Sequence, residues 1–281
     1  MLTALGVLII SPDGLLTRLV TADSLTLTYW RGLYFGYGMT FLLLLIYRTK
    51  TLSLFLSIGI PGLMMIALYS LGNISFIYSI THTSVANTLF ILSSTPLFAA
   101  LISWLFLRER IGLRTGIAIV AAAIGIYIIF SGPGVLETST QGNFAGLVGS
   151  MLLAGSFVVV RQNKSRNLMP ALALGGICNA MLLSPMVSIG NTSESDLVVL
   201  FVMGFVMLPL AMTLMFIVPK YIPTPEVGLM LLLESILGPL WVWIVLGENP
   251  GTRALVGGAI VLATLAINSI WALLETRAAE T

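Results

Sequence analysis

Residues 84–130 read SVANTLFILSSTPLFAALISWLFLRERIGLRTGIAIVAAAIGIYIIF, which is two apolar stretches joined by one short basic turn. Each stretch has about the 20 residues that a helix needs to cross the hydrocarbon core of a bilayer. The whole chain has this character, because 58% of its 281 residues are hydrophobic and only 9% are charged. Soluble proteins have roughly 45–50% and about 25%. The sequence therefore predicts an integral membrane protein and excludes an ordinary cytosolic enzyme or a nucleic-acid-binding protein.

Polar residues, prolines and glycines divide the chain into ten apolar stretches, each of which is predicted to be a membrane-spanning helix. The stretches are residues 2–20, 26–47, 55–80, 84–107, 112–131, 144–162, 169–190, 195–219, 225–246 and 252–274. The loops between them are too short to form a soluble domain. The predicted fold class is all-α, an integral membrane protein with ten transmembrane helices.

Basic residues predict the orientation of these helices, since cytoplasmic loops carry an excess of Lys and Arg. Most of the basic residues fall on one side of the predicted bilayer: Arg48, Lys50, Arg108, Arg110, Arg114, Arg161, Lys164, Arg166, Lys220 and Arg277. The loops at 21–25, 132–143 and 191–195 contain no Lys or Arg, and Arg253 is the main exception on that side. Both termini are therefore expected in the cytoplasm, with the chain in the cell (inner) membrane.

The two halves of the chain resemble each other. Residues 84–130 align with residues 223–269 without a gap, and the alignment sets Glu109 against Glu248. Both glutamates belong to a shared turn, Leu-x-Glu-x-x-Gly-x-Arg, and their predicted role is to brace that turn. Such self-similarity is typical of transporters that are built from repeats.

A weaker match sets Arg18 against Arg161. Each half has five predicted spans, an odd number, so the second half must be inverted in the bilayer. The predicted organisation is a first five-helix repeat at 1–131, an outward loop at 132–143 and a second, inverted five-helix repeat at 144–281.

The segment TLFILSSTPLFAALISWLFLRERIGLRTGIAIVAAAIGIYI resembles the signature of the EamA-type drug/metabolite transporters, and EVGLMLLLESILGPLWVWIVLGENPGTRALVGGAIVLA carries the same signature in the second half. The stretches GVLIISPDGLLTRL and YWRGLYF resemble the first two helices of one branch of that family. The resemblance implies a ten-helix fold, cytoplasmic termini and carriage of small metabolites or drug-like compounds, often outward. It implies no single binding motif.

Asp13 is the clearest candidate for a functional residue, because an ionisable side chain inside an apolar span is costly unless it faces a partner or a cavity. With Ser11 it belongs to a polar turn, SPDG, in which Pro12 predicts a break near the middle of the helix. Carriers use broken helices at their binding sites. Either Asp13 handles substrate or protons, or it forms a structural ion pair with Arg31 or Arg18.

Glu234 is the second candidate, since it falls near the midplane of its predicted span. A lipid-like environment disfavours the charged form of a carboxyl group. That property suits proton coupling or the recognition of an amine. The alternative is a protonated carboxyl group that donates a hydrogen bond to a neighbouring helix.

Uncharged polar residues in the spans are further candidates for the lining of a cavity: Asn73, Tyr78, Asn87, Ser93, Ser94, Thr95, Ser156 and Thr213. The alternative for Ser and Thr is a hydrogen bond to the backbone of their own helix or a role in helix packing. The motifs Gly32-x-x-x-Gly36 and Gly112-x-x-x-Gly116 predict close contacts between helices, within the monomer or in a dimer.

The leading hypothesis for function is a secondary carrier that moves a small molecule by alternating access, with export favoured by the family resemblance and a proton as candidate coupling ion. The expected partners are that substrate and membrane lipids, in a monomer or a homodimer. The alternatives are a lipid scramblase or a channel, and a membrane enzyme that uses Asp13 and Glu234 as an acid/base pair. One cysteine and one histidine, Cys178 and His82, leave no basis for a metal site, and no cofactor is expected.

Overall fold

The computed structural model describes residues 2–108, 111–131, 139–187, 190, 192–217 and 224–280. Within these ranges every regular element is a helix, so the all-α class is confirmed there. The elements are α1 (Leu2–Ile10), α2 (Asp13–Leu19), α3 (Ser24–Tyr47), η1 (Arg48–Lys50), α4 (Thr51–Leu56), α5 (Gly59–His82), α6 (Val85–Ser93), α7 (Thr95–Leu107), α8 (Leu113–Phe130), α9 (Ser139–Gln162), α10 (Met169–Leu183), η2 (Ser184–Met186), α11 (Glu194–Phe201), η4 (Val202–Met207), α12 (Leu208–Ile217), α13 (Thr224–Leu246) and α14 (Thr252–Glu280).

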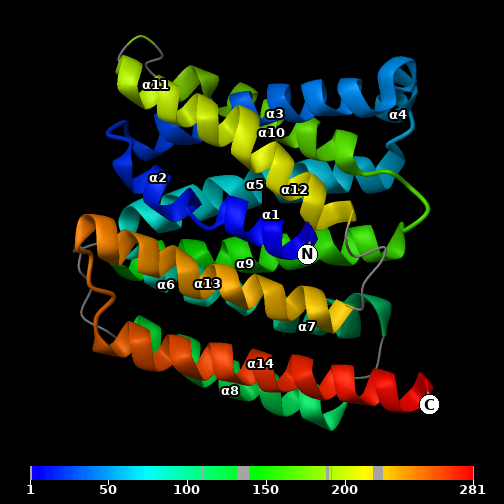
Figure 1. Ribbon diagram of the computed structural model, residues 1–281, viewed down its shortest axis with the longest axis vertical. Helices are drawn as coiled ribbons and strands as arrows, with labels where there is room; N and C mark the ends of the chain where they lie inside the picture. The colour runs from blue at the N-terminus through cyan, green and yellow to red at the C-terminus, as the bar shows by residue number, and fades with distance from the viewer. Residues whose placement is uncertain are drawn as a thin grey trace.

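The helices lie side by side and alternate in direction, so that their ends gather at two opposite ends of the molecule (Figure 1). Helix α14 ends at the right-hand end of that view and helix α1 begins right of its centre, whereas α2, α5 and α13 end at the left. Among the described residues, eight helical stretches are long and apolar enough to cross a membrane: 24–56, 59–82, 85–107, 113–130, 140–162, 169–186, 194–214 and 252–274. The described chain is therefore that of a multi-pass membrane protein.

Three of the predicted spans contain irregularities. The first is two helices, since α1 ends at Ile10 and α2 begins at Asp13, as Pro12 predicts. The fourth is interrupted at Ser94, between α6 and α7. In the eighth, the segment η4 joins α11 to α12 as a π-helix, a rare form that is frequent at functional sites. Helix α9 begins at Ser139, inside the segment expected to be an outward loop, and residues 132–138 of that segment lie outside the described part.

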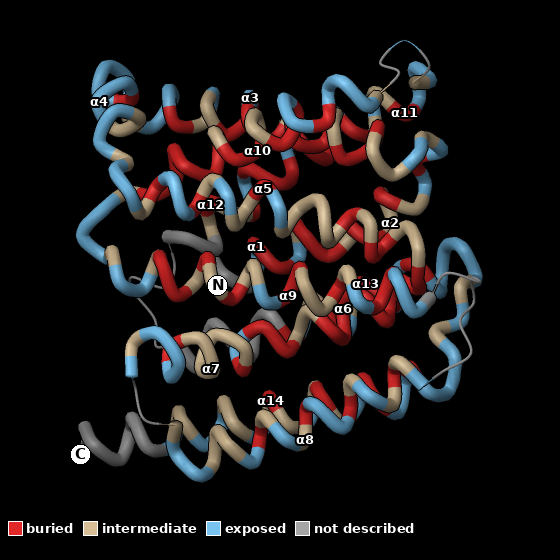
Figure 2. Tube along the Cα trace, turned by 180° about the vertical axis from the view of Figure 1, so that it is seen from behind, coloured by how far each residue is buried: buried red, intermediate tan, exposed pale blue. Residues whose placement is uncertain are grey.

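Apolar side chains cover the outside of the stack as well as its interior. Figure 2 shows exposed positions along the outward faces of the helices and buried positions between them. Leu56, Phe106 and Leu113 are 74–83% exposed, an arrangement that suits lipid as the surrounding solvent. The largest core cluster includes Phe35, Met39 and other buried residues of α3, α5, α10 and η4.

Helix α3 packs closely on α10 through glycines. A Cβ atom added to Gly32 would lie 2.9 Å from the carbonyl oxygen of Gly176, and one added to Gly36 would lie 2.9 Å from that of Ala173. The first glycine motif thus permits close packing within the monomer, as expected. A Cβ atom on Gly116 would meet nothing within 4 Å among the described residues, so the second motif makes no such contact there.

Basic residues collect at the end of the stack where α3, α7, α9 and α14 end (Figure 1). Arg48 and Lys50 form η1 after α3, Arg108 follows α7, and Arg161 lies in the last turn of α9. Arg110 and Lys220 lie outside the described residues.

Candidate functional site

The break between α1 and α2 sets the geometry of the candidate site. The amide of Ser11 still donates to the carbonyl of Val7 at 2.9 Å, but Pro12 has no N–H with which to continue the ladder. The amide of Leu16 donates to the carbonyl of Pro12 at 2.9 Å and so starts the next helix. Asp13 therefore stands in the first turn of α2, where a negative side chain interacts favourably with the helix dipole.

Asp13 forms an ion pair with Arg31 of α3. Asp13 Oδ2 lies 2.9 Å from Arg31 Nη2, and each side chain is only 7% exposed. The guanidinium group also lies over the ring of Phe76, with Cζ 5.2 Å from the ring centroid, and Nη1 lies 3.5 Å from Thr17 Oγ1. Of the two pairings considered from the sequence, the structure contains the one with Arg31. An ion pair that can open and close is compatible with either role expected for Asp13.

Two atoms of this ion pair have unused hydrogen-bonding capacity. Asp13 Oδ1 and Arg31 Nε are buried, and neither has a hydrogen-bond partner within the described ranges. Buried polar atoms are nearly always hydrogen-bonded to protein, to water or to a bound molecule. The pair thus offers one acceptor and one donor to a ligand.

Helix α13 of the second half covers the helix break. Trp241 Nε1 donates to Ser11 Oγ at 3.1 Å, and a Cβ atom on Gly238 would lie 3.8 Å from the carbonyl oxygen of Ser11. Glu234, one turn earlier on α13, is close enough to Asp13 and Arg31 to interact with both charges. The structure therefore brings together four of the predicted residues, namely Ser11, Asp13, Arg31 and Glu234.

The predicted hydroxyl residues lie apart from this group and serve helix contacts. Ser93 and Ser156 donate to carbonyl oxygens of their own helices, those of Phe90 and Leu152. Thr95 donates to the carbonyl of Leu92 and lies 3.0 Å from Ser150 Oγ on α9. Thr213 contacts the sulfur atom of Met39 at 3.7 Å.

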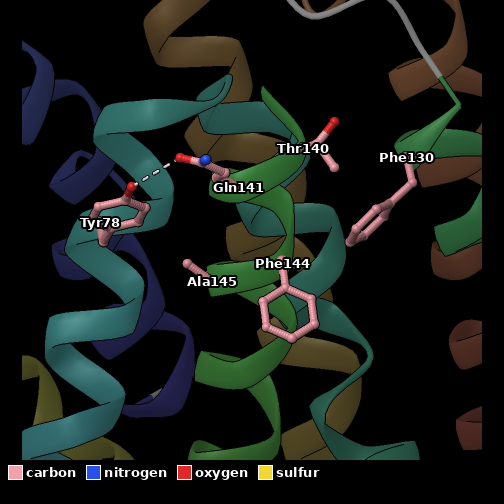
Figure 3. A pocket seen from close by; sticks show the side chains of 6 residues that line it. All are labelled: Tyr78, Phe130, Thr140, Gln141, Phe144 and Ala145. Carbon is pink, nitrogen blue, oxygen red and sulfur yellow. Dashed lines mark hydrogen bonds between the residues drawn. The ribbon is translucent and has the colours of Figure 1, made fainter. Parts of the chain in front are cut away.

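Asn73 and Tyr78 both lie on α5, but in different surroundings. Asn73 is half-buried one turn before Phe76. Tyr78 stacks on His82, with ring centroids 3.9 Å apart, and donates to Gln141 Oε1 at 3.4 Å. It lines a cleft of about 490 Å³ whose other walls include Phe130 and Phe144 (Figure 3). That cleft is apolar and open, and it is separate from the Asp13–Arg31 pair.

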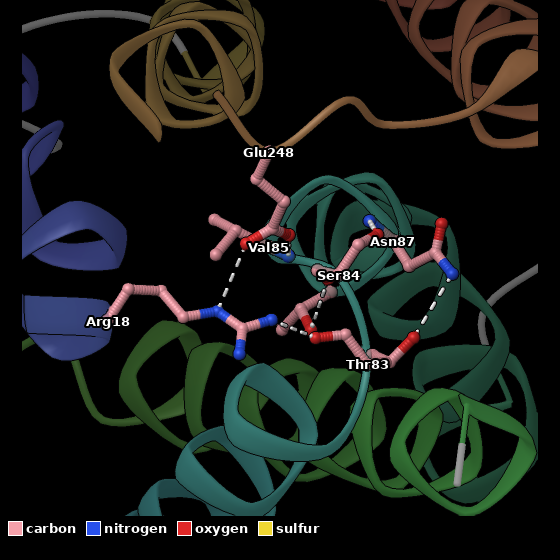
Figure 4. A network of polar contacts seen from close by, with 7 residues as sticks. Arg18, Thr83, Ser84, Val85, Asn87 and Glu248 are labelled. Carbon is pink, nitrogen blue, oxygen red and sulfur yellow. Dashed lines mark hydrogen bonds and ion pairs between the residues drawn. The ribbon is translucent and has the colours of Figure 1, made fainter. Parts of the chain in front are cut away.

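A second ion pair was not foreseen in the sequence. Arg18 Nε lies 3.3 Å from Glu248 Oε2 (Figure 4), at the end of the stack where α2 and α13 end (Figure 1). Glu248 therefore contacts the other half of the chain instead of bracing only its own turn. The repeat alignment singled out both residues but gave no reason to bring them together.

A polar cleft of about 410 Å³ opens beside this second ion pair, lined by Thr17, Arg18, Asp23 and His82 among others. Asp23 also caps α3, since its carboxylate accepts hydrogen bonds from the amides of Leu25 and Thr26. Partial burial acts to raise the pKa of Asp23, but hydrogen bonds from Thr26 and Leu25 outweigh it and hold that pKa below its usual value. No three His, Cys, Asp or Glu side chains in the described ranges form a group that could hold a metal ion.

The chain belongs to the EamA-like transporter family, whose model matches residues 1–131 and again residues 140–270. It is thus a membrane transporter-like protein with two copies of the family unit. No curated protein matches it. One protein of known crystal structure has the same fold, with a TM-score of 0.70 and 14% sequence identity over 96% of each chain.

Proposed function

We propose that this protein is a secondary carrier that exports a small molecule by alternating access, with Asp13, Arg31 and Glu234 as its central site. The observation that carries the proposal is the buried Asp13–Arg31 pair at a broken helix, under a helix of the other repeat. Charged groups within a membrane span are rare, and they mark substrate and ion pathways.

The proposal includes ten spans in two inverted repeats, with α1–α2 and α13 as the two that join the eight long apolar helices. Packing supports this arrangement, because corresponding spans exchange partners as a two-fold relation requires. Helix α3, the second predicted span, packs on α10, the seventh. Helix α8, the fifth, packs on α14, the tenth. Helix α5 packs on α9, and correspondingly α12 packs on α1.

The chemistry of the site favours a substrate that carries a protonated amine. Two carboxyl groups and one guanidinium group give the site an excess of acid, so it attracts a cation or a proton. An amine can donate to Asp13 Oδ1, and an acceptor group on the same molecule can use Arg31 Nε. Glu234 is the proposed proton carrier, which would release its proton when the amine binds.

The basic residues at the end of the stack where α14 ends support a cytoplasmic location for that end, in the inner membrane. Under this orientation the Arg18–Glu248 pair lies on the outward side. Two reporters fused to the C-terminus would test the orientation, one that is fluorescent in the cytoplasm and one that is active in the periplasm. Under the proposed orientation, only the fluorescent reporter should give a signal.

Purified protein in liposomes, screened against amines, zwitterions and anions, tests the proposal. We expect saturable uptake of an amine-bearing compound, driven by a pH gradient. Asp13→Glu should raise the substrate concentration for half-maximal uptake about 10-fold or more, because a hydrogen bond to a charged group contributes about 1.5–3 kcal/mol. Glu234→Gln should abolish the response to the pH gradient.

Glu194→Gln is the matched control, since Glu194 is an exposed carboxylate on α11 away from the site. It should behave as wild type. Uptake that does not saturate would indicate a channel instead. Normal transport by both site variants would remove Asp13 and Glu234 from the site while leaving the carrier proposal in place.

A further inference from the structure

Arg18 and Glu248 join the two halves of the chain at one end of the stack. Arg18 is in the last turn of α2, and Glu248 follows α13 in the turn that leads to α14. Their charged groups are 3.3 Å apart, and the side chains are 19% and 17% exposed. The contact therefore spans 230 positions of sequence and lies near the surface but is not fully solvated.

Each member of the pair is also held by the segment that begins α6 (Figure 4). Glu248 Oε1 accepts a hydrogen bond from the amide of Val85 at 3.0 Å, the first residue of α6. Arg18 Nη2 donates to the carbonyl of Thr83. The two charges thus tie together the ends of α2, α6 and α13.

The pair lies between the buried site and the outside. Arg18 follows Asp13 by five positions, which is about 7–8 Å along a helix axis. It lines the polar cleft together with Thr17, and Thr17 Oγ1 lies 3.5 Å from Arg31 Nη1. A molecule that leaves the Asp13–Arg31 pair toward this end meets Thr17 first and then Arg18.

We propose that the Arg18–Glu248 pair is a latch that closes this end of the transport path and that it must open for substrate to pass. The inference rests on the proposed transport function. When the latch opens, the end of α13 separates from α2 and α6, and the cleft becomes continuous with the buried site. The two side chains are partly exposed, so water can take over their contacts once they separate, and the pair can close and open repeatedly.

The repeat adds a sequence relation to this latch. The alignment sets Arg161 against Arg18 and Glu109 against Glu248, so the same two charges recur in positions predicted for the opposite end. Glu109 lies outside the described residues, and the latch proposed here is the Arg18–Glu248 pair alone.

Thiol labelling tests the latch without any knowledge of the substrate. In a Cys178→Ser background, a single cysteine at Ser11 or Thr17, both buried, is exposed to a membrane-impermeant methanethiosulfonate reagent added from the latch end. Glu248→Gln should raise the labelling rate by up to about 5-fold, the shift that follows from losing up to about 1 kcal/mol of bias toward the closed form. The Gln side-chain oxygen can still accept a hydrogen bond from the Val85 amide, so this variant removes the charge while keeping that hydrogen bond.

Arg18→Gln should raise the labelling rate by a similar factor, and the double variant Arg18→Gln with Glu248→Gln should be no faster than either single variant, because the two charges act as one pair. Arg18→Lys, which keeps the charge, should lie between wild type and Arg18→Gln. Arg253→Gln is the control, since Arg253 is an exposed cation in the same turn region that bonds to the Ser131 carbonyl. It should leave the labelling rate unchanged.

The outcomes separate the two proposals. If labelling rises in the latch variants but no compound in the panel is transported, the latch stands and the carrier function fails. If a compound is transported and both single variants label and transport as wild type does, the latch is overturned. Additive effects of the two substitutions would overturn it as well, because they would show that the charges act separately.

Discussion

The described part of the protein contains two Arg–carboxylate pairs that are alike in chemistry and different in surroundings. The Asp13–Arg31 pair is 2.9 Å long, buried in the stack and close to Glu234. The Arg18–Glu248 pair is 3.3 Å long, more exposed, and satisfied by backbone groups on both sides. Among the described residues, the first leaves both an acceptor, Asp13 Oδ1, and a donor, Arg31 Nε, without a hydrogen bond. In the second, Arg18 Nε has only its ion pair with Glu248, while other atoms of the two side chains bond to backbone groups at helix ends. Burial thus separates a pair suited to binding a ligand from a pair suited to holding a conformation.

The largest expected effect is on the buried pair. Asp13→Asn removes the charge that is paired with Arg31 and should cost about 3–5 kcal/mol of stability, as breaking a buried pair does. The midpoint of thermal unfolding in detergent measures it, with Glu194→Gln as control. Asp13→Asn combined with Arg31→Gln should be less destabilised than Asp13→Asn alone. If Asp13→Asn were as stable as Glu194→Gln, the buried pair would not contribute to stability in this way.

The next effect concerns the packing that positions Arg31. Gly32→Ala would bring a Cβ atom to 2.9 Å from the Gly176 carbonyl oxygen, and overpacking of this kind typically costs about 1–3 kcal/mol. Gly116→Ala meets open space and should be neutral or stabilising by up to about 1 kcal/mol, since Ala is the better helix former. Unfolding midpoints that move in the same direction for both variants would contradict the close α3–α10 contact.

A smaller effect is expected at the partly exposed Arg18–Glu248 pair. Glu248→Gln should reduce stability by about 0.2–1 kcal/mol at low salt, and added salt should shrink that difference because it screens exposed charges. The loss in Asp13→Asn should persist in salt. Unfolding midpoints of both variants at low and high ionic strength therefore sharpen the contrast. If the stability losses of the two variants depended equally on salt, the contrast between the two pairs would disappear.

The smallest effect is a pH dependence at the same end of the stack. The folded-state pKa of Asp23 lies below its unfolded value, so its contribution to stability is present above the unfolded pKa and is lost as the pH falls through the folded pKa. Asp23→Asn keeps a good helix cap but cannot titrate. Wild type should therefore lose slightly more stability than Asp23→Asn between about pH 5 and about pH 3. Parallel curves for the two proteins would exclude this contribution.

Much of the fold follows from the sequence, since apolar length determines spans and Pro12 removes the hydrogen-bond donor where the first helix breaks. The sequence alone leaves two partners open for Asp13, Arg31 and Arg18, because both arginines fall near the same end of neighbouring helices. The Arg18–Glu248 pair was not foreseen, since residues 230 positions apart meet only through the packing of α13 on α2. The hydroxyls of Ser93 and Ser156 could equally face a cavity or their own backbone, and only rotamers decide between these.

The π-helical segment η4 has a consequence for the register of the eighth predicted span. A π-turn accommodates one residue more than an α-turn, so deletion of one residue within Val202–Met207 would let α11 and α12 join as a continuous α-helix. Because the wider turn absorbs that residue, the side chains of α12 would keep the faces that they present now. The same residues wound as an ordinary α-helix without the deletion would turn those side chains by about 100° about the helix axis. Met203 and Gly204, which contact Thr17 and the backbone of Arg31, would then stand at a different angle to Thr213. The wider turn thus sets the angular phase between the half of the span beside the charged site and the half beside Met39.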